Sequence, residues 1–188
     1  MVGEIVPFLY DVVIFEGSQG LLLDMERGFF PNVTPSKVGL NGIPEEFLHD
    51  AELYLVTRTY LTRHGNGYNP ITRGFNLDLK DKYETNLYND YQGEFKTGIF
   101  NVDLLNTALT RHCIDNYVIQ YNIKPNLVIT HWDLLKNNKE FVCFNKGKIE
   151  YFEYSEPEHL IPFFKNCFDI KYQDVYVNDK IEGNLKKF

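Results

Sequence analysis

The tetrapeptide Thr130–Asp133, at the end of an apolar run, carries the clearest chemistry in the sequence. Leu127–Thr130 is typical of a buried strand, and it runs directly into His131–Asp133. A carboxylate there can accept hydrogen bonds from both N1–H and the exocyclic N2 amine of guanine, a pair of donors that adenine lacks. Asp133 therefore predicts a guanine site. A base that leaves the buried carboxylate without hydrogen-bond donors binds much more weakly, so such a site discriminates strongly. The alternative is an exposed aspartate that caps the helix after it.

Two glycine loops also follow strand-like runs. Glu16–Gly20 comes after the β-branched run Asp11–Phe15, and Gly65–Gly67 comes after an alternating run that ends at Thr62. Loops at the carboxyl ends of strands are where α/β sheets usually bind ligands, although such glycines are also typical of plain turns. Neither is a phosphate-binding P-loop, because the sequence has no GxxxxGK[ST] and Gly65–Gly67 lacks the lysine that reaches the β and γ phosphates.

A third candidate is the glycine-punctuated polar stretch Tyr91–Gly98, which carries one cation, Lys96. One interpretation is a mobile anion-binding loop in front of the helical pattern that begins at Val102. The other is a solvated surface pair of Lys96 with Glu94, which contributes little free energy.

The pattern of the whole chain predicts strands that alternate with helices. Glu52–Thr62 has the period-two alternation of a strand, whereas apolar residues recur at helical spacing over Val102–Asn116. Ser155–Glu158 has the form of a capping box with proline in the first turn, which opens a second helix. The remaining predicted strands are Asp11–Phe15, Leu127–Thr130, Glu140–Phe144, Lys148–Tyr154 and Asp174–Val177, and the last runs into Asn178. This alternation indicates an α/β or α+β fold, which we expect to form a single domain over residues 1–188.

Composition excludes several classes of protein. The 188 residues are 44% hydrophobic and carry a net charge of -7, which suits one globular core. No apolar run approaches the roughly 18 residues of a membrane-spanning helix and no secretion signal is present, so we expect a cytoplasmic protein that does not bind membranes. The negative charge argues against binding a nucleic-acid polymer but leaves single nucleotides as ligands. Cys113, Cys143 and Cys167 lack zinc-ligand spacing and predict reduced structural thiols.

Five segments, in order, resemble the later half of the adenylosuccinate synthetase family. Val13–Asp24, VIFEGSQGLLLD, resembles the family's VLFEGAQGxLLD, and Gly28–Thr34, GFFPNVT, is similar to its GTYPFVT at the same spacing. Thr59–Gly67, TYLTRHGNG, is similar to AYxTRVGxGP. Gly93–Asn101, GEFKTGIFN, resembles a one-residue-longer GRPRRxGWFD loop, and Leu127–Leu135, LVITHWDLL, resembles LxLTKLDVL. The resemblance implies an α/β fold with a mixed, mostly parallel sheet flanked by helices.

The resemblance also implies substrates. In that family a phosphate from GTP activates the 6-oxygen of IMP, and the amine of L-aspartate then displaces it to give adenylosuccinate. The corresponding residues imply that Gln19 and Thr34 hold the purine monophosphate, Thr34 through its phosphate. A loop closes over L-aspartate and the triphosphate, and it consists of Gly93, Glu94, Phe95, Lys96 and Thr97. Asp133, with His131 and the tail residue Asn178, reads the guanine of GTP, so we expect Gln19, Thr34 and Asp133 to line a common cleft.

The sequence departs from the family at several of these positions. Lys96 stands alone where the family loop carries several arginines, which weakens capture of the aspartate carboxylates and leaves the amino donor open. His131 replaces a lysine and Tyr176–Asn178 replaces Ser-Val-Gly, so the choice of guanine over another base is also open. The shortened loop resembles compact, divergent or viral members. The GDEGKGK loop with its catalytic aspartate, and the catalytic histidine, are absent, so no catalytic residue is assigned and Mg²⁺ is expected only with that missing half.

Two hypotheses follow. The first is the substrate- and guanine-binding half of a ligase of purine biosynthesis, active only when joined to an N-terminal half on a longer polypeptide or on a separate chain. By analogy with the family, it could also form a homodimer. The second is a non-catalytic nucleotide-binding or interaction module that kept the fold and lost the chemistry. The sequence does not decide whether the sugar is ribose or deoxyribose. It also does not decide between IMP and a GMP-type monophosphate, or between GTP and ATP as the triphosphate.

Overall fold

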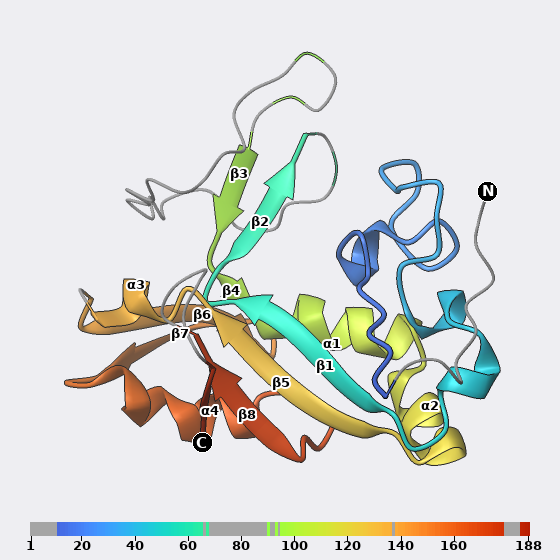
Figure 1. Ribbon diagram of the computed structural model, residues 1–188. Helices are drawn as coiled ribbons and strands as arrows, with labels where there is room; N and C mark the ends of the chain where they lie inside the picture. The colour runs from blue at the N-terminus through green and yellow to red at the C-terminus, as the bar shows by residue number, and fades with distance from the viewer. Residues whose placement is uncertain are drawn as a thin grey trace.

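A four-stranded sheet forms the centre of the molecule (Figure 1). The computed structural model describes residues 11–65, 67, 90, 93, 95–136, 138–178 and 185–188. The strands of this sheet, in spatial order, are β1 (Glu52–Arg58), β5 (Lys124–Thr130), β8 (Asp174–Val177) and β9 (Lys186–Lys187). β1, β5 and β8 run parallel, and only the short β9 is antiparallel. The predicted α/β class with a mostly parallel sheet is confirmed.

Two smaller sheets and four α-helices complete the described structure. An antiparallel pair consists of β2 (Leu61–His64) and β3 (Phe95–Gly98), and a three-stranded sheet consists of β4 (Phe100–Asn101), β6 (Glu140–Asn145) and β7 (Lys148–Glu153). The α-helices are α1 (Val102–Arg111), α2 (Ile114–Tyr121), α3 (Asp133–Lys136) and α4 (Ile161–Asn166). The 3-10 helices are η2 (Leu21–Leu23), η3 (Leu40–Gly42), η4 (Glu45–Phe47) and η5 (Pro157–Leu160). Among the described residues, no helix combines the length and apolar character needed to cross a membrane.

The predicted helix Val102–Asn116 is two helices in the structure. Asn101 caps α1, because its side-chain oxygen accepts a hydrogen bond from the Leu104 N–H at 2.8 Å. α1 ends before Cys113, whose left-handed φ of 52° turns the chain into α2. The helical spacing of the apolar residues continues across this break, so the periodicity alone did not reveal it.

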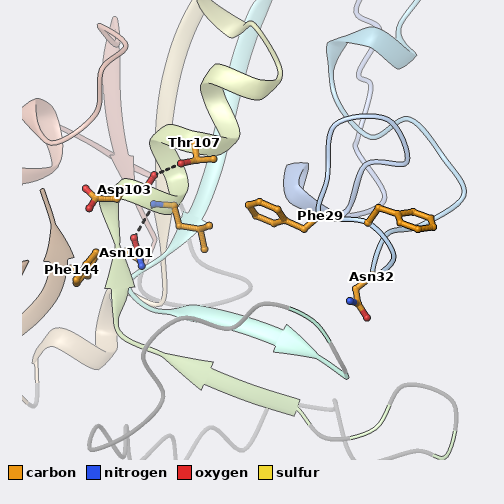
Figure 2. A pocket seen from close by; sticks show the side chains of 8 residues that line it. Phe29, Asn32, Asn101, Asp103, Thr107 and Phe144 are labelled. Atoms are coloured by element: carbon orange, nitrogen blue, oxygen red, sulfur yellow. Dashed lines mark hydrogen bonds between the residues drawn. The ribbon is translucent and has the colours of Figure 1, made fainter. Parts of the chain in front are cut away.

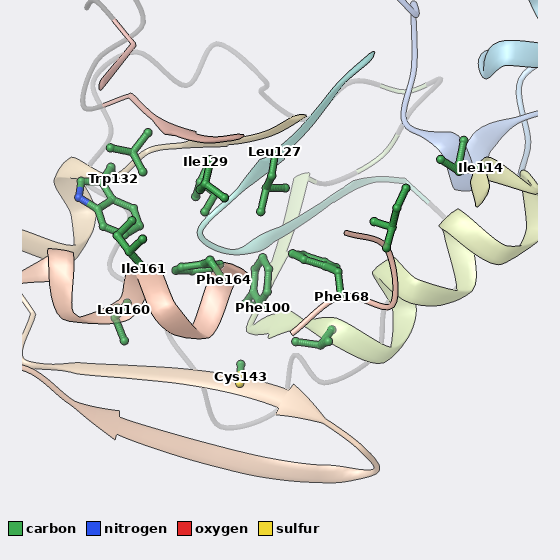
Figure 3. Packing of buried hydrophobic residues seen from close by; sticks show 14 of the residues in the cluster. Phe100, Ile114, Leu127, Ile129, Trp132, Cys143, Leu160, Ile161, Phe164 and Phe168 are labelled. Carbon is green, nitrogen blue, oxygen red and sulfur yellow. The ribbon is translucent and has the colours of Figure 1, made fainter. Parts of the chain in front are cut away.

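The core lies between the sheet and the helices behind it in Figure 1, and it is rich in phenylalanine. Leu127 and Ile129 of β5 point into it at 2% and 0% exposure. Phe100 and Phe164 lie below them with ring centroids 5.3 Å apart, in the edge-to-face arrangement that aromatic pairs prefer (Figure 3). Cys143 is fully buried there, and this burial raises the pKa of its thiol to about 12. The three cysteines are free, as predicted, although Cys113 is exposed.

Three expectations about elements are wrong. Asp11–Phe15 is not a strand: Val12 and Ile14 are 74% and 85% exposed, and no described strand pairs with this run. The predicted strand Glu52–Thr62 bends after Arg58 into two strands that belong to different sheets. The helix after Ser155–Glu158 begins as the 3-10 helix η5, without a side-chain cap, and becomes α-helical only at Ile161.

Candidate functional site

The carboxyl ends of β5 and β8 lie side by side, and two predicted guanine-binding residues meet there. His131 follows β5 and Asn178 follows β8. The Asn178 backbone N–H donates to the Ile129 carbonyl at 3.0 Å, and the Asn178 carbonyl accepts from the Trp132 N–H at 3.1 Å. His131 has a left-handed φ of 59°, which turns the chain out of the strand at once. The parallel pairing of β5 with β8 therefore brings His131 and Asn178 together.

Asp133 lies directly beyond them as the first residue of α3. Trp132, 1% exposed and with its ring centroid 5.8 Å from that of Phe164, anchors this turn in the core. The half-buried Asp133 carboxylate forms no hydrogen bond or ion pair with another described residue. Within the described structure, Asp133 therefore does not cap α3. Both carboxylate oxygens are available to accept hydrogen bonds from a ligand.

The end of β1 supplies the third side of this group. The Thr59 hydroxyl donates to the His131 carbonyl at 3.2 Å, and the edge of the Tyr60 ring meets the His131 ring at 5.5 Å between centroids. Arg58 Nη1 donates to the Tyr60 hydroxyl at 3.2 Å. A cation, a phenol and an imidazole thus stand at the carboxyl edge of the sheet, the usual ligand-binding edge of an α/β fold.

The hairpin of β2 and β3 extends beyond this edge as an arm (Figure 1). The expectation of a loop is wrong for Phe95, Lys96 and Thr97, because they lie in strand β3. Gly93 precedes the strand with a φ of 73°, and Glu94 lies outside the described residues. Lys96 stands opposite Arg63 in the register. Directly opposed side chains of an antiparallel pair point to the same side, so the arm carries two cations on one face.

Arg63 also connects the arm to the substrate loop predicted from the sequence. Its Nη2 donates to the Asn32 carbonyl at 3.1 Å, two residues before Thr34. Gly67 makes room for this guanidinium, since a Cβ at Gly67 would overlap it. Gly67 also has a φ of 126°, which side chains rarely tolerate. This packing is a physical reason for a glycine in Gly65–Gly67.

The predicted monophosphate residues Gln19 and Thr34 lie in one irregular segment, residues 17–42. Gln19 is exposed and Thr34 is half-buried. The Thr34 N–H donates to the Leu23 carbonyl at 2.7 Å, and its hydroxyl lies 3.4 Å from that of Ser36. The backbone bond ties Thr34 to η2, which begins two residues after Gln19.

A fully buried carboxylate, Asp24, organises this segment. It accepts hydrogen bonds from the backbone N–H groups of Glu26, Arg27 and Val38 at 2.8, 3.0 and 2.8 Å. Burial by itself raises the pKa of Asp24, but the N–H groups of Val38, Glu26 and Arg27 outweigh it and hold the pKa below its ordinary value. Asp24 is therefore ionised in the folded protein and closes the loop that carries Thr34.

His112, at the end of α1, attaches the same segment to the helix. Its Nε2 lies 2.8 Å from the Leu21 carbonyl, and because a carbonyl only accepts, Nε2 carries the proton. Burial lowers the pKa of His112, against the raising effects of the Leu21 carbonyl and Asp24, so the ring is neutral. His112 and Asp24 together fix η2 and the chain that follows it.

The residues predicted from the sequence thus form two groups and not one. α3, which begins at Asp133, and the blue segment that contains Gln19 and Thr34 lie on opposite sides of the β2–β3 arm in Figure 1. Residues 68–89 lie outside the described part of the chain.

Two cavities lie along α1, and neither is lined by a predicted site residue. One, of about 420 Å³, separates Phe29 and Asn32 from the start of α1, where Asn101, Asp103 and Thr107 face it (Figure 2). The other, of about 510 Å³, follows the polar side of α1 as far as Arg111 and Cys167. Among the described residues, no three His, Cys, Asp or Glu side chains gather in a way that could hold a metal ion.

Comparison with known proteins identifies the family. The model of the adenylosuccinate synthetase family matches residues 10–144. The chain belongs to the adenylosuccinate synthetase family. It is 32% identical over 172 residues to the adenylosuccinate synthetase of Aquifex aeolicus, with 81% of this chain and 36% of the relative covered. It is 30% identical over 168 residues to that of Hydrogenobaculum sp., covering 81% and 37%, and 29% identical over 199 residues to that of Eremothecium gossypii, covering 90% and 41%.

The chain thus matches between about a third and two fifths of the length of these synthetases. The match to the family model includes the residues predicted to hold the monophosphate and Asp133, and it ends before Asn178. The resemblance stated from the five motifs is confirmed at the level of the family.

Sequence reasoning missed three residues that shape the site: Asp24, Arg63 and His112. All three lay inside or beside quoted motifs, but their partners are distant in the chain or are backbone atoms. An aspartate after three leucines was a usable signal for Asp24, because a charged residue at the end of an apolar run is rarely buried without several donors. The contacts of Arg63 and His112 had no such local signal.

Proposed function

We propose that this chain supplies the substrate- and guanine-binding part of an adenylosuccinate-synthetase-like ligase in purine nucleotide biosynthesis. It binds an IMP-like purine monophosphate and the base of GTP for condensation with L-aspartate, and it needs a separate N-terminal half for catalysis. Membership of the family supports the class of reaction. The observation that carries the proposal is the Asp133 carboxylate at the carboxyl edge of the parallel sheet, without a partner among the described residues.

The surroundings of Asp133 suit a guanine. The carboxylate accepts N1–H and N2–H, while His131 and Asn178 border the base from the ends of β5 and β8. Adenine offers no such pair of donors, so ATP binds more weakly than GTP. The half-burial of Asp133 reduces competition from water and strengthens both hydrogen bonds.

The segment with Gln19 and Thr34 suits the purine monophosphate. The Thr34 hydroxyl donates to a phosphate oxygen, and the Gln19 amide matches the donor and acceptor edge of the purine. Asp24 and His112 hold this segment in place before the ligand arrives, which lowers the entropy cost of binding.

The arm suits the carboxylates of L-aspartate. Lys96 and Arg63 face the same side of the β2–β3 hairpin, so Arg63 adds a second cation to the single lysine of this loop. Two cations at this place attract both the dicarboxylate and the triphosphate. The Mg²⁺ expected for the triphosphate is proposed to bind only with the N-terminal half, as the resemblance to the family implies.

Calorimetry with GTP and ATP on the 188-residue chain tests the proposal. Asp133→Asn keeps the shape but removes one acceptor and the charge, so GTP affinity falls at least tenfold, in line with about 1.5–3 kcal/mol for a charged hydrogen bond, while ATP affinity is unchanged. Asp115→Asn, an exposed aspartate on α2, is the matched control and leaves both affinities unchanged.

Equal GTP binding by wild type and Asp133→Asn would contradict the guanine assignment. A folded chain that binds neither nucleotide would instead favour the second hypothesis, an interaction module without the chemistry. Turnover of IMP, GTP and L-aspartate by the isolated chain would contradict the need for another half.

A further inference from the structure

The cavity of about 420 Å³ beside the start of α1 has the composition of a small-molecule site. It lies between α1 and the irregular segment 17–42, and the rings of Phe29, Phe30 and Phe144 form part of its wall (Figure 2). We call it the α1 cavity. Its volume falls in the range of roughly 300–1,000 Å³ that is typical of ligand pockets, which are mostly apolar with a few placed polar groups. Aromatic walls of this kind favour a planar ligand.

Asn101 presents hydrogen-bond donors to the α1 cavity that no described residue accepts. The residue is 3% exposed and lines the cavity, and its Oδ1 accepts from the Leu104 N–H at 2.8 Å. This bond caps α1 and fixes the plane of the carboxamide, so the direction of Nδ2 is fixed as well. Nδ2 has no hydrogen-bond partner among the described residues. A buried amide donor without an acceptor costs free energy, so a ligand that accepts from Asn101 gains affinity.

Asn32 supplies a second carboxamide from the opposite wall of the α1 cavity (Figure 2). Its backbone carbonyl accepts from Arg63 Nη2 at 3.1 Å, which holds the residue in place. Its half-buried side chain has no hydrogen-bond partner among the described residues. Each carboxamide provides two N–H donors, and Asn32 adds its acceptor oxygen.

The other polar groups that line the α1 cavity are already engaged. The Asp103 carboxylate accepts from the backbone N–H groups of Lys146 and Gly147 at 2.7 and 2.8 Å. The Thr107 hydroxyl donates to the Asp103 carbonyl at 2.8 Å. The residues described as lining the cavity include no lysine or arginine that could hold a phosphate. The cavity therefore suits a neutral ring that has more acceptors than donors.

We propose that the α1 cavity binds the adenine base of a nucleoside. Adenine is planar and carries several ring-nitrogen acceptors with a single amino group. The Asn32 carboxamide accepts from N6–H and donates to N7, the bidentate pair that asparagine makes with adenine. Asn101 Nδ2 donates to another ring nitrogen, and the phenylalanine rings contact the faces of the base.

The α1 cavity is separate from the site proposed for GTP and prefers a different base. Its described lining includes none of Gln19, Thr34 and Asp133. Guanine brings N1–H and N2–H donors, which match the free carboxylate of Asp133 but find few free acceptors in the α1 cavity. The inference goes beyond the proposed function, because it adds a ligand that the reaction does not need at this position.

Calorimetry with adenosine on the 188-residue chain tests the proposal. Asn101→Asp keeps the cap of α1, because asparagine and aspartate cap helices about equally well. It replaces the Nδ2 donor with an oxygen that repels the lone pair of a ring nitrogen, so adenosine affinity falls at least about tenfold. Asn116→Asp makes the same change of charge at an exposed site on α2 and leaves the affinity unchanged.

A second variant tests the aromatic wall. Phe30 is 86% exposed, so Phe30→Leu does not disturb folding, and loss of its ring weakens adenosine binding at least about fivefold. Asp133→Asn leaves adenosine binding unchanged, because Asp133 does not line the α1 cavity.

Four results would overturn the proposal. They are no adenosine binding by the folded wild-type chain, guanosine binding as tight as that of adenosine, equal adenosine binding by wild type and Asn101→Asp, and loss of adenosine binding in Asp133→Asn. GTP calorimetry on the same preparation separates the two proposals. A chain that binds adenosine but not GTP refutes only the proposed function, and a chain that binds GTP but not adenosine refutes only the adenine site.

Discussion

β5 and β1 lie side by side in the central sheet but differ in how well their side chains are buried. Leu127 and Ile129 point into the core and are 2% and 0% exposed, packed on phenylalanines of β4 and α4. Val128 points to the opposite face and is 5% exposed, while its neighbour Val56 on β1, on that same face, is 66% exposed. The run Leu-Val-Ile has no period-two alternation, and this is the pattern of a strand buried on both faces. The described chain buries β5 on both faces, since Asn126 and Val128 are 3% and 5% exposed, whereas β1 beside it leaves Val56 mostly exposed.

The largest effect is expected in the core that β5 faces. Ile129→Ala removes a fully buried side chain from the aromatic core and leaves a cavity, so it destabilises the fold by about 2–5 kcal/mol. Urea unfolding followed by circular dichroism measures the loss. A change below about 1 kcal/mol would show that the core relaxes around the cavity and that the two strands are less different than their exposure indicates.

An intermediate effect is expected from a buried polar group, Asp24. Asp24→Asn replaces a carboxylate that accepts three backbone hydrogen bonds and lowers stability at pH 7 by about 1–3 kcal/mol. The folded pKa of Asp24 is lowered, so the advantage of the wild type is complete above the ordinary pKa of 3.8 and is lost as pH falls through the lowered value. Urea unfolding of both proteins at pH 7 and pH 3 measures this change.

Asp133→Asn is the control for that prediction. Its carboxylate has no partner among the described residues, so the substitution changes stability by less than about 0.5 kcal/mol at either pH. A pH-independent difference between wild type and Asp24→Asn would contradict the assignment of an ionised Asp24.

The smallest effect is expected at the exposed Val56 of β1. Val56→Thr keeps the β-branched shape and changes the stability of the isolated chain by less than about 0.5 kcal/mol, because the side chain is mostly in water. Thermal unfolding of the isolated chain measures it. A loss comparable to that of Ile129→Ala would mean that Val56 is already covered in solution.

Strands whose own residues show a complete apolar or alternating pattern were predicted well. β5, β6, β7 and β8 lie within a few residues of their predicted bounds, because each is an apolar or alternating run between turn residues. The pattern of Asp11–Phe15 was equally strong, yet it forms no strand in the described structure. A strand needs neighbours at its edges, and a sequence pattern does not say whether the neighbours are present.

The sequence predicted some features of the candidate site and not others. His131 and Asn178 were assigned to the same base, and the structure places them together at the ends of paired strands. The two-group arrangement of Asp133 and Thr34 could not be inferred, because it depends on the path of the β2–β3 arm. The pairing of Arg63 with Lys96 across that arm depends on register, which neither strand specifies alone.

Under the proposed function, the hydrogen bond from Arg63 to the Asn32 carbonyl couples the β2–β3 arm to the segment that contains Thr34. Any ligand that shifts the arm changes the free energy of the loop beside Thr34, and linkage requires the reverse effect to be equal in size. Binding of one ligand would therefore change the affinity for the other through the Arg63 guanidinium.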